Sequence, residues 1–130
     1  MSKLKIKKVY YDNGQVESEV YYKNNKLHRE NGPAYIQYFE NGKIKSERYY
    51  VNNLLHRENG PAFIEYRENS TIQHEEYWIK GKIHKEDGPA VIWYYENGKI
   101  SSERYFLNDT EVDILQEMVM RALFRENINY

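Results

Sequence analysis

Short runs of apolar and aromatic residues, separated by polar turns, recur along this chain at a fixed interval. The polar segment that begins at His28 returns at His56 and His84, a spacing of 28 residues, and each copy ends in Gly-Pro-Ala. A fixed period of this length is typical of repeat proteins, in which each unit packs only on its neighbours. The pattern therefore predicts a stack of similar units.

Each unit is predicted to contain a β-hairpin. Residues 33–40 are rich in Tyr, Ile and Phe, and they begin at a proline, which is accepted as the first residue of a strand. Asn41-Gly42 is a strong hairpin-turn signal, and residues 43–52 have the composition of a return strand. Asn52-Asn53 then turns the chain into a connector that closes on the next Gly-Pro.

The length of the hairpin turn decides which side chains share a face. A three-residue loop with glycine in the left-handed conformation suits Glu-Asn-Gly-Lys. This register places on one face the columns of Ala34, Ile36, Tyr38, Ile44, Ser46 and Tyr50. A two-residue loop would move the side chains of the return strand to the opposite faces, because side chains alternate along a strand. In the third hairpin Ser70 replaces the glycine, which predicts a strained turn.

The pattern changes after residue 109. Thr110 to Asp113 resembles a helix capping box, and apolar residues recur at helical spacing: Val112, Leu115, Met118, Val119, Ala122 and Leu123. The predicted fold is mainly β, an elongated single antiparallel sheet of four stacked β-hairpin repeats, closed by a C-terminal capping α-helix. Residues 1–130 form one domain, with an N-terminal capping hairpin at 4–27, repeats at 28–55, 56–83 and 84–109, and the helix at 110–126.

Composition disfavours several classes of function. The 19 Lys and Arg residues balance 20 Asp and Glu residues, so no net field attracts nucleic acid or an anionic membrane. Cysteine is absent, which excludes disulfides and thiolate metal sites. No run approaches the roughly 18 apolar residues that a membrane span needs, and the first residues lack the apolar core of a signal peptide. We therefore expect a soluble, cytoplasmic protein.

The repeated histidines have a structural interpretation. Equivalent residues of neighbouring hairpins lie about 9–10 Å apart, whereas zinc ligands lie about 2 Å from the metal. His28, His56 and His84 therefore cannot share an ion. We expect each ring to hydrogen-bond a backbone group of the connector region, and we expect the lone His74 to be exposed.

Glutamates also recur, on the return strands at 19, 47, 75 and 103 and in the connectors at 30, 58 and 86. Paired carboxylates can hydrolyse glycosides, but a catalytic site is singular, whereas these carboxylates stand in every unit. No nucleophile elbow, phosphate-binding loop or His-Glu-x-x-His motif is present. The sequence therefore predicts no enzyme activity, no bound metal and no cofactor.

Several of these residues together resemble the MORN-repeat variant, a family of β-hairpin repeats. The likeness rests on Asn41-Gly42-Lys43, Glu47, Tyr49-Tyr50, Gly81-Lys82 and Gly88-Pro89, and it covers about residues 5 to 109. The His-Arg-Glu-Asn/Asp-Gly-Pro-Ala form is similar to repeats in proteins of giant DNA viruses and in bacterial antitoxin-like proteins. The resemblance implies a row of β-hairpins and a binding or scaffold role.

The columns that differ between units indicate where a partner binds. On the first strand of each hairpin, the side opposite Ala-Ile-Tyr provides the candidate binding face: Tyr35, Gln37, Phe39, Phe63, Arg67, Trp93 and Tyr95. Trp, Tyr and Arg dominate the energetics of protein interfaces. The alternative is that these rings only pack across the hairpin against the recurring tyrosines, since aromatic residues favour strands.

The function expected from the sequence is a non-enzymatic protein–protein interaction module or scaffold that presents an extended aromatic sheet face. An antitoxin or inhibitor would be one form of such a module. Two alternatives remain. A structural repeat protein could assemble with itself through sheet edges as a homo-oligomer, and a single-stranded nucleic-acid binder could stack bases on the aromatic residues, although the balanced charge disfavours nucleic acid.

Overall fold

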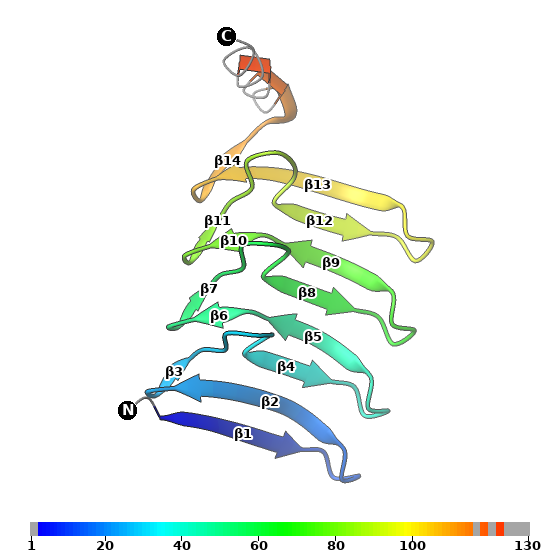
Figure 1. Cartoon of the computed structure of the whole chain (residues 1–130). Coiled ribbons are helices and arrows are strands. Elements are labelled where there is room, and N and C mark those ends of the chain that lie inside the picture. The colour runs from blue at the N-terminus through cyan, green and yellow to red at the C-terminus, as the bar shows by residue number, and fades with distance from the viewer. Residues whose placement is uncertain (1–2, 116–117, 120–121, 124–130) are drawn as a thin grey trace.

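The computed structural model describes residues 3–115, 118–119 and 122–123, and its main feature is a 10-stranded antiparallel sheet (Figure 1). Four hairpins lie side by side in this sheet: β1 (Leu4–Tyr10) with β2 (Val16–Lys23), β4 (Tyr35–Tyr38) with β5 (Ile44–Arg48), β8 (Phe63–Tyr66) with β9 (Ile72–Glu76), and β12 (Val91–Tyr94) with β13 (Ile100–Leu107). Neighbouring hairpins pair through β2 and β4, β5 and β8, and β9 and β12. The prediction of a mainly β, antiparallel fold is confirmed.

Each return strand leads into a second, much shorter hairpin at one side of the sheet. The short strands are β3 (Lys26–Leu27), β6 (Tyr50–Val51), β7 (Leu54–Leu55), β10 (Trp78–Ile79), β11 (Lys82–Ile83) and β14 (Thr110–Val112). Both residues of every turn in this series have positive φ: Asn24-Asn25, Asn52-Asn53, Lys80-Gly81 and Asn108-Asp109. Two successive left-handed residues form the type I′ turn, which suits the twist of a two-residue hairpin.

The repeated histidines tie these short hairpins together. The Nδ1 atom of His28 accepts a hydrogen bond from the backbone N–H of Asn52, at 3.1 Å. His56 accepts in the same way from Lys80, at 2.8 Å, and His84 accepts from Asn108, at 3.0 Å. Each ring therefore joins a connector to the short turn one repeat further on, which confirms the predicted structural role.

The turns of the long hairpins contain the predicted three-residue loop. In the second hairpin the backbone N–H of Phe39 donates to the carbonyl of Lys43, and Gly42 between them has a φ of 90°. Ser70 takes the position of this glycine in the third hairpin with a φ of 70°. Ser70 thus adopts the left-handed conformation that strains a non-glycine residue.

A β-bulge beyond each loop changes which residues share a face. Tyr38 pairs with Ile44, but the next pair is Gln37 with Ser46, so that Lys45 is the extra residue. The same shift occurs in the other three hairpins. Because side chains alternate along a strand, one extra residue turns the rest of the return strand over.

The predicted assignment of faces is therefore wrong for most of the return strand. Glu47, rather than Ser46, lies opposite Ile36. Ser46 lies opposite Gln37 on the other face, and Tyr50 lies beyond this strand, in β6. Ile44 precedes the bulge and shares the face of Tyr38, as the sequence predicted.

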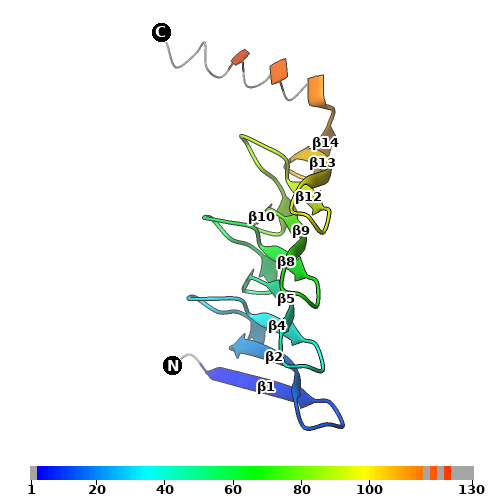
Figure 2. The ribbon, with the colours of Figure 1, turned by 90° about the vertical axis from the view of Figure 1, so that its right-hand side faces the viewer.

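One face of the sheet is almost the same in every hairpin, and the connectors between hairpins run over it (Figure 2). Its buried residues are Ala34, Ile36, Ala62, Ile64, Ala90 and Ile92. In each connector a cation lies over a tyrosine ring of this face, Arg29 over Tyr21, Arg57 over Tyr49 and Lys85 over Tyr77, at 4.0, 4.1 and 3.9 Å. We call this surface the connector face.

Another repeated contact on the connector face joins neighbouring hairpins. A tyrosine hydroxyl of each hairpin donates to a glutamate of the preceding one: Tyr38 to Glu19 (3.2 Å), Tyr66 to Glu47 (2.6 Å) and Tyr94 to Glu75. Burial, together with Glu19, raises the pKa of Tyr38 to about 12. The hydroxyl therefore stays protonated at neutral pH and remains a donor.

The prediction that a C-terminal helix begins at Thr110 is wrong. Thr110–Val112 forms β14, which pairs with Tyr105–Leu107, so the repeat pattern continues past Asp109. The type I′ turn at Asn108-Asp109 reverses the chain before a helix could begin. Beyond it, the structure describes only residue pairs with helical backbone at 114–115, 118–119 and 122–123, and their side chains are exposed.

These exposed side chains do not cover the last hairpin, so the described residues form no cap. The remainder of the predicted helix, up to residue 126, lies outside the described residues. Within the part of the chain that the structure describes, no helix is long and apolar enough to cross a membrane.

Candidate protein-interaction face

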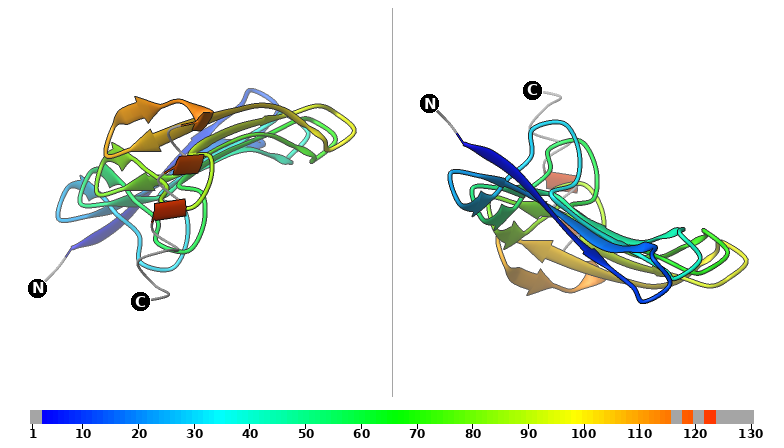
Figure 3. Two further views of the ribbon diagram at one scale, coloured as in Figure 1. Left: turned by 90° about the horizontal axis from the view of Figure 1, so that it is seen from above. Right: turned by 90° about the horizontal axis from the view of Figure 1, so that it is seen from below.

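The second face of the sheet differs from one hairpin to the next. We call it the variable face and define it by the residues that pair across it: Ser18, Val20, Tyr35, Gln37, Ser46, Arg48, Phe63, Glu65, His74, Glu76, Val91, Trp93, Ser102 and Arg104. Described strands make substantial contacts only with their sheet neighbours, so no second layer of strands covers this face. Figure 3 shows the sheet along its length, with the hairpins stacked and twisted about one axis.

Burial on the variable face comes from side chains that stand beside one another. Ser46 is only 2% exposed and His74 only 4% exposed, although both point away from the connectors. Phe63 and Trp93 pack on the ring of His74, and Ser46 stands between Gln37 and Glu65 on the flanking strands.

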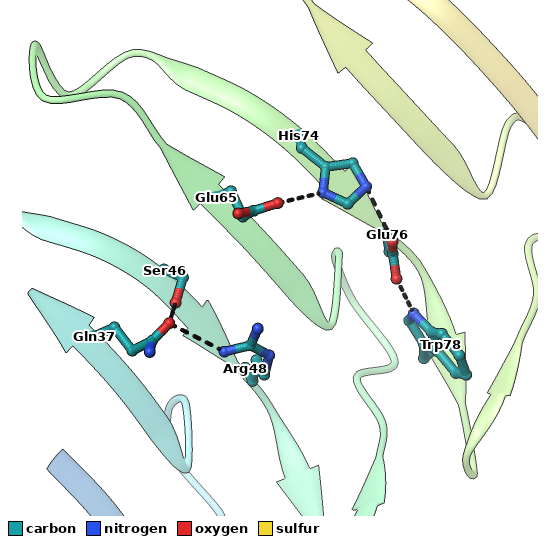
Figure 4. Close-up of polar contacts among 7 residues, drawn as sticks. All are labelled: Gln37, Ser46, Arg48, Glu65, His74, Glu76 and Trp78. Carbon is teal, nitrogen blue, oxygen red and sulfur yellow. Dashed lines mark hydrogen bonds and ion pairs between the residues drawn. The ribbon is translucent and has the colours of Figure 1, made fainter. Parts of the chain in front are cut away.

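The third hairpin places a charged cluster at the centre of this face (Figure 4). Nδ1 of His74 lies 2.9 Å from a carboxylate oxygen of Glu65, which is directly opposite on β8. Nε2 of His74 lies 3.0 Å from a carboxylate oxygen of Glu76, and the other oxygen of Glu76 accepts from the indole N–H of Trp78 at 2.8 Å. The imidazole is thus held between two carboxylates.

Burial by itself lowers the pKa of His74, but the contacts with Glu76 and Glu65 outweigh burial and raise it above its ordinary value. Burial by itself raises the pKa of Glu76, but the contacts with His74 and Trp78 prevail and lower it. The two shifts agree, because each partner favours the charged form of the other. His74 and Glu76 are therefore stabilised as a largely buried ion pair.

Two aromatic rings pack on the same imidazole, one from the next hairpin and one from the hairpin of His74 itself. Trp93 of β12 stacks on His74, with ring centres 4.0 Å apart and planes 15° from parallel. Phe63 of β8 meets His74 edge to face at 5.4 Å. Trp93 remains 37% exposed, so its indole is fixed in place and still faces solvent.

The second hairpin has a different arrangement at the equivalent position (Figure 4). The hydroxyl of Ser46 donates to the side-chain oxygen of Gln37 at 2.7 Å, and Arg48 contacts the same oxygen at 3.4 Å. The guanidinium of Arg48 lies 4.2 Å from the ring centre of Phe63 and 5.5 Å from that of Tyr35. Arg48 therefore links the aromatic residues of two hairpins.

Four of the residues predicted to form the binding face lie on the variable face: Tyr35, Gln37, Phe63 and Trp93. The other three lie just past the ends of their strands. Phe39 follows β4, with Lys45 near its ring, and Tyr95 follows β12 and is exposed. Arg67 follows β8 and donates to the backbone carbonyls of Ile72 and Tyr94, which fastens the third turn to the fourth hairpin.

The binding face predicted from the sequence did not include Arg48, His74, Glu76 or Trp78. The prediction that His74 is exposed is wrong, because the bulge turns its side chain towards Glu65 and Trp93. One signal was available: His74 stands in a column otherwise occupied by Ser18, Ser46 and Ser102. A large polar residue in a column of small ones needs partners on adjacent strands.

The connector face has concavities of its own. Two equivalent grooves, of about 560 and 580 Å³, lie between successive connectors, one beside Tyr49 and Arg57 and the next beside Tyr77 and Lys85. The residues that line the two grooves occupy equivalent positions in successive repeats. In the described part of the chain, no group of three or more His, Cys, Asp or Glu side chains is arranged to hold a metal ion.

Comparison with known proteins agrees with the hairpin architecture. The model of the family described as MORN repeat variant matches residues 4–24, 34–52 and 90–108, which are the first, second and fourth hairpins. These segments make up less than half of the 130 residues, and the third hairpin, with the His74 cluster, is not matched. No curated protein and no solved structure matches the chain. Over three hairpins, the chain is therefore similar to the MORN repeat variant.

Proposed function

We propose that this chain is a non-enzymatic protein-interaction module of four hairpin repeats, and that it binds a protein partner on the variable face. The observation that supports the proposal is the contrast between the two faces. The connector face repeats the same Ala, Ile, Tyr and Glu contacts and is crossed by connectors. The variable face is free of connectors and has a different polar and aromatic set in each hairpin.

The composition of the variable face suits recognition of another protein. Trp93, Phe63 and Tyr35 supply aromatic area, and Arg48 lies near the rings of Tyr35 and Phe63. Trp, Tyr and Arg are the residues most often found at the energetic centre of an interface. The stack on His74 holds Trp93 before a partner arrives, which reduces the conformational entropy lost on binding.

Similarity to the MORN repeat variant favours the same general role, a repeat-based interaction or scaffold module. An antitoxin or inhibitor is one form that this role would take. Single-stranded nucleic acid is the less favoured ligand, because Glu65 and Glu76 stand among the aromatic rings and repel phosphates.

The proposal is tested by capture of partners on the purified chain, followed by titration of a captured protein with wild type and variants. We expect Trp93→Ala to weaken binding of that protein at least about tenfold, the usual effect of removing an interface anchor. Trp93→Phe retains a ring to stack on His74 and should lose less. Isothermal titration calorimetry measures both affinities.

The matched control is Glu58→Lys, which reverses an exposed charge on a connector, beyond the reach of a partner on the variable face. Unchanged affinity in this variant, with a loss in Trp93→Ala, supports the variable face. Equal binding by Trp93→Ala and wild type, with a loss in Glu58→Lys, would instead place the partner on the connector face. Thermal unfolding of each variant separates lost binding from lost folding.

A further inference from the structure

The two ends of the sheet expose complementary halves of a contact that the protein makes three times internally. Inside the molecule, the outer edge of each return strand is paired with the first strand of the next hairpin. The last return strand, β13, pairs with β12 along its inner edge, but on its outer edge it pairs with β14 only at Tyr105–Leu107, so no described strand pairs with the outer edge of Ser102–Arg104. At the other end, β1 is the first strand of the sheet, and all its side chains are exposed.

The missing neighbour changes the surroundings of equivalent residues. Ser18, Ser46 and His74 are buried, whereas Ser102 in the same column is exposed. A groove of about 510 Å³ lies at this edge, lined by Ile100–Tyr105 and Glu111–Ile114. It occupies the place where the internal repeats hold the next hairpin.

β1 has the residues of an internal first strand at the positions that contact the preceding hairpin. Tyr10 stands one period before Tyr38, in the column whose hydroxyls donate to the preceding glutamate. In the described part of the chain, the hydroxyl of Tyr10 has no glutamate of this kind, because no hairpin precedes β1. Glu103 is the corresponding glutamate at the opposite end and accepts there from the hydroxyl of Tyr105 at 2.7 Å.

We propose that β1 of a second copy of this chain adds to β13, so that copies assemble head to tail. The internal register predicts the new pairs: Ser102 with Val9, Glu103 with Lys8 and Arg104 with Lys7 of the second copy. The strands run antiparallel, as they do at every internal junction. Tyr10 of the second copy then donates to Glu103 and completes a fourth Tyr–Glu contact.

Charge favours this pairing over the alternatives. Lys8 of the second copy then lies between two carboxylates. One is Glu103 of the first copy, and the other is Glu19 of the second copy, which pairs with Lys8 from β2. Arg104, opposite Lys7, is already neutralised by two hydrogen bonds to Glu111, at 2.9 and 2.8 Å. Two β1 strands could not pair with each other as well, since lysines 5, 7 and 8 repel their counterparts.

A head-to-tail contact uses two different surfaces, so the assembly stays open and can grow. This inference concerns the ends of the sheet and is independent of the partner proposed for the variable face. Its first test is sedimentation velocity of the full chain at increasing concentration, in about 50 mM salt, where charge pairs are weakly screened. We expect the average mass to rise with concentration for the wild type.

Charge reversal tests the predicted pair. Lys8→Glu and Glu103→Lys each place like charges together, and each should raise the concentration needed for assembly at least about tenfold. An equimolar mixture of the two variants restores opposite charges at every junction and should assemble again. Tyr10→Phe should weaken assembly by a smaller factor, whereas the control Tyr95→Phe, in an exposed turn, should leave it unchanged.

Cysteine crosslinking tests the register separately, because the natural chain has no cysteine. A Ser102→Cys chain mixed with a Val9→Cys chain should form a disulfide dimer under mild oxidation, and Ser101→Cys should not replace Ser102→Cys. A wild-type chain that stays monomeric at every concentration overturns the proposal. So does an assembly that both charge reversals leave intact, or a mixture of the two that remains monomeric.

Discussion

The connector face and the variable face are built from alternating residues of the same strands, yet only one of them repeats. On the connector face, Ile36, Ile64 and Ile92 are buried to the same degree beneath similar connectors. On the variable face, the equivalent pairs are Gln37 with Ser46, Glu65 with His74, and Trp93 with Ser102. The stacking of hairpins therefore depends on one face and leaves the composition of the other free to differ.

Matched aspartate substitutions on neighbouring residues give the largest expected effect. Ile64→Asp puts a carboxylate between Glu47 and Glu75 in the buried column of the connector face. A buried, unpaired charge beside like charges should cost about 3–5 kcal/mol of unfolding free energy. Phe63→Asp, one residue away on the variable face, should cost about half as much, because Arg48 lies 4.2 Å from this ring and can pair with the new carboxylate.

Urea unfolding followed by circular dichroism measures both losses. Ile72→Asp is the control for the chemistry of the substitution, since Ile72 lies at the bulge and is partly exposed. It should cost less than either of the other variants. A larger loss for Phe63→Asp than for Ile64→Asp would mean that the variable face, rather than the connector face, stabilises the stack.

The His74 cluster makes a variable position contribute to stability in a pH-dependent way. Its raised pKa means that the protonated ring stabilises the fold fully below the ordinary histidine value of about 6.5. This contribution is lost as pH rises through the pKa of His74 in the folded protein. The lowered pKa of Glu76 sets the acid limit, because its contribution is lost as pH falls below about 4.5.

We therefore expect wild type to be more stable than His74→Gln by about 1–2 kcal/mol between about pH 5 and 6.5, with a smaller difference at pH 8. Unfolding of both proteins across this range measures the difference. An NMR titration of the His74 ring should give a pKa above 6.5. A difference that does not change with pH would show that His74 acts through packing on Trp93 alone.

The repeated features of the fold could be predicted because each repeats a local rule. The 28-residue period predicted the hairpins, Asn-Gly predicted the three-residue loop, and the recurrence of His28, His56 and His84 pointed to backbone contacts. The histidine contact follows from the 28-residue period, since His28 accepts from a residue 24 positions away, whereas the cause of the hairpin turn lies within a few residues of its signal. The alternation of Tyr35 and Gln37 against Ile36 on the first strand was also correct for this reason.

The bulge at Lys45 could not be read from the sequence, because it depends on pairing between two strands rather than on the residues of one. Missing it placed Ser46 on the wrong face and left His74 without its partners. The error at Thr110 was different in kind, since a capping-box pattern competed with the turn signal of Asn108-Asp109. The alignment of Asn108-Asp109 with Asn24-Asn25 and Asn52-Asn53 would have favoured the turn.

The smallest expected effect concerns Ser70, which stands where the other three long hairpins have a glycine. Ser70 adopts a φ of 70° where Gly42 and Gly98 have 90° and 87°. The cost to a non-glycine residue is partly offset in this turn, because Thr71 donates to Asn69 through both its backbone N–H and its hydroxyl. A glycine at this position would also lose more conformational freedom on folding than serine does.

Ser70→Gly should therefore stabilise the protein by only about 0.5–1 kcal/mol, and Gly98→Ser should destabilise it by a similar amount. Gly98 is the matched position, since a Cβ there meets no atom within 4 Å and only the backbone conformation is tested. Both changes are measurable as shifts in the urea midpoint at constant slope. If neither substitution moves the midpoint, the left-handed backbone is not what keeps glycine in this column, and the constancy of the turns would need a cause outside the folding of the hairpin.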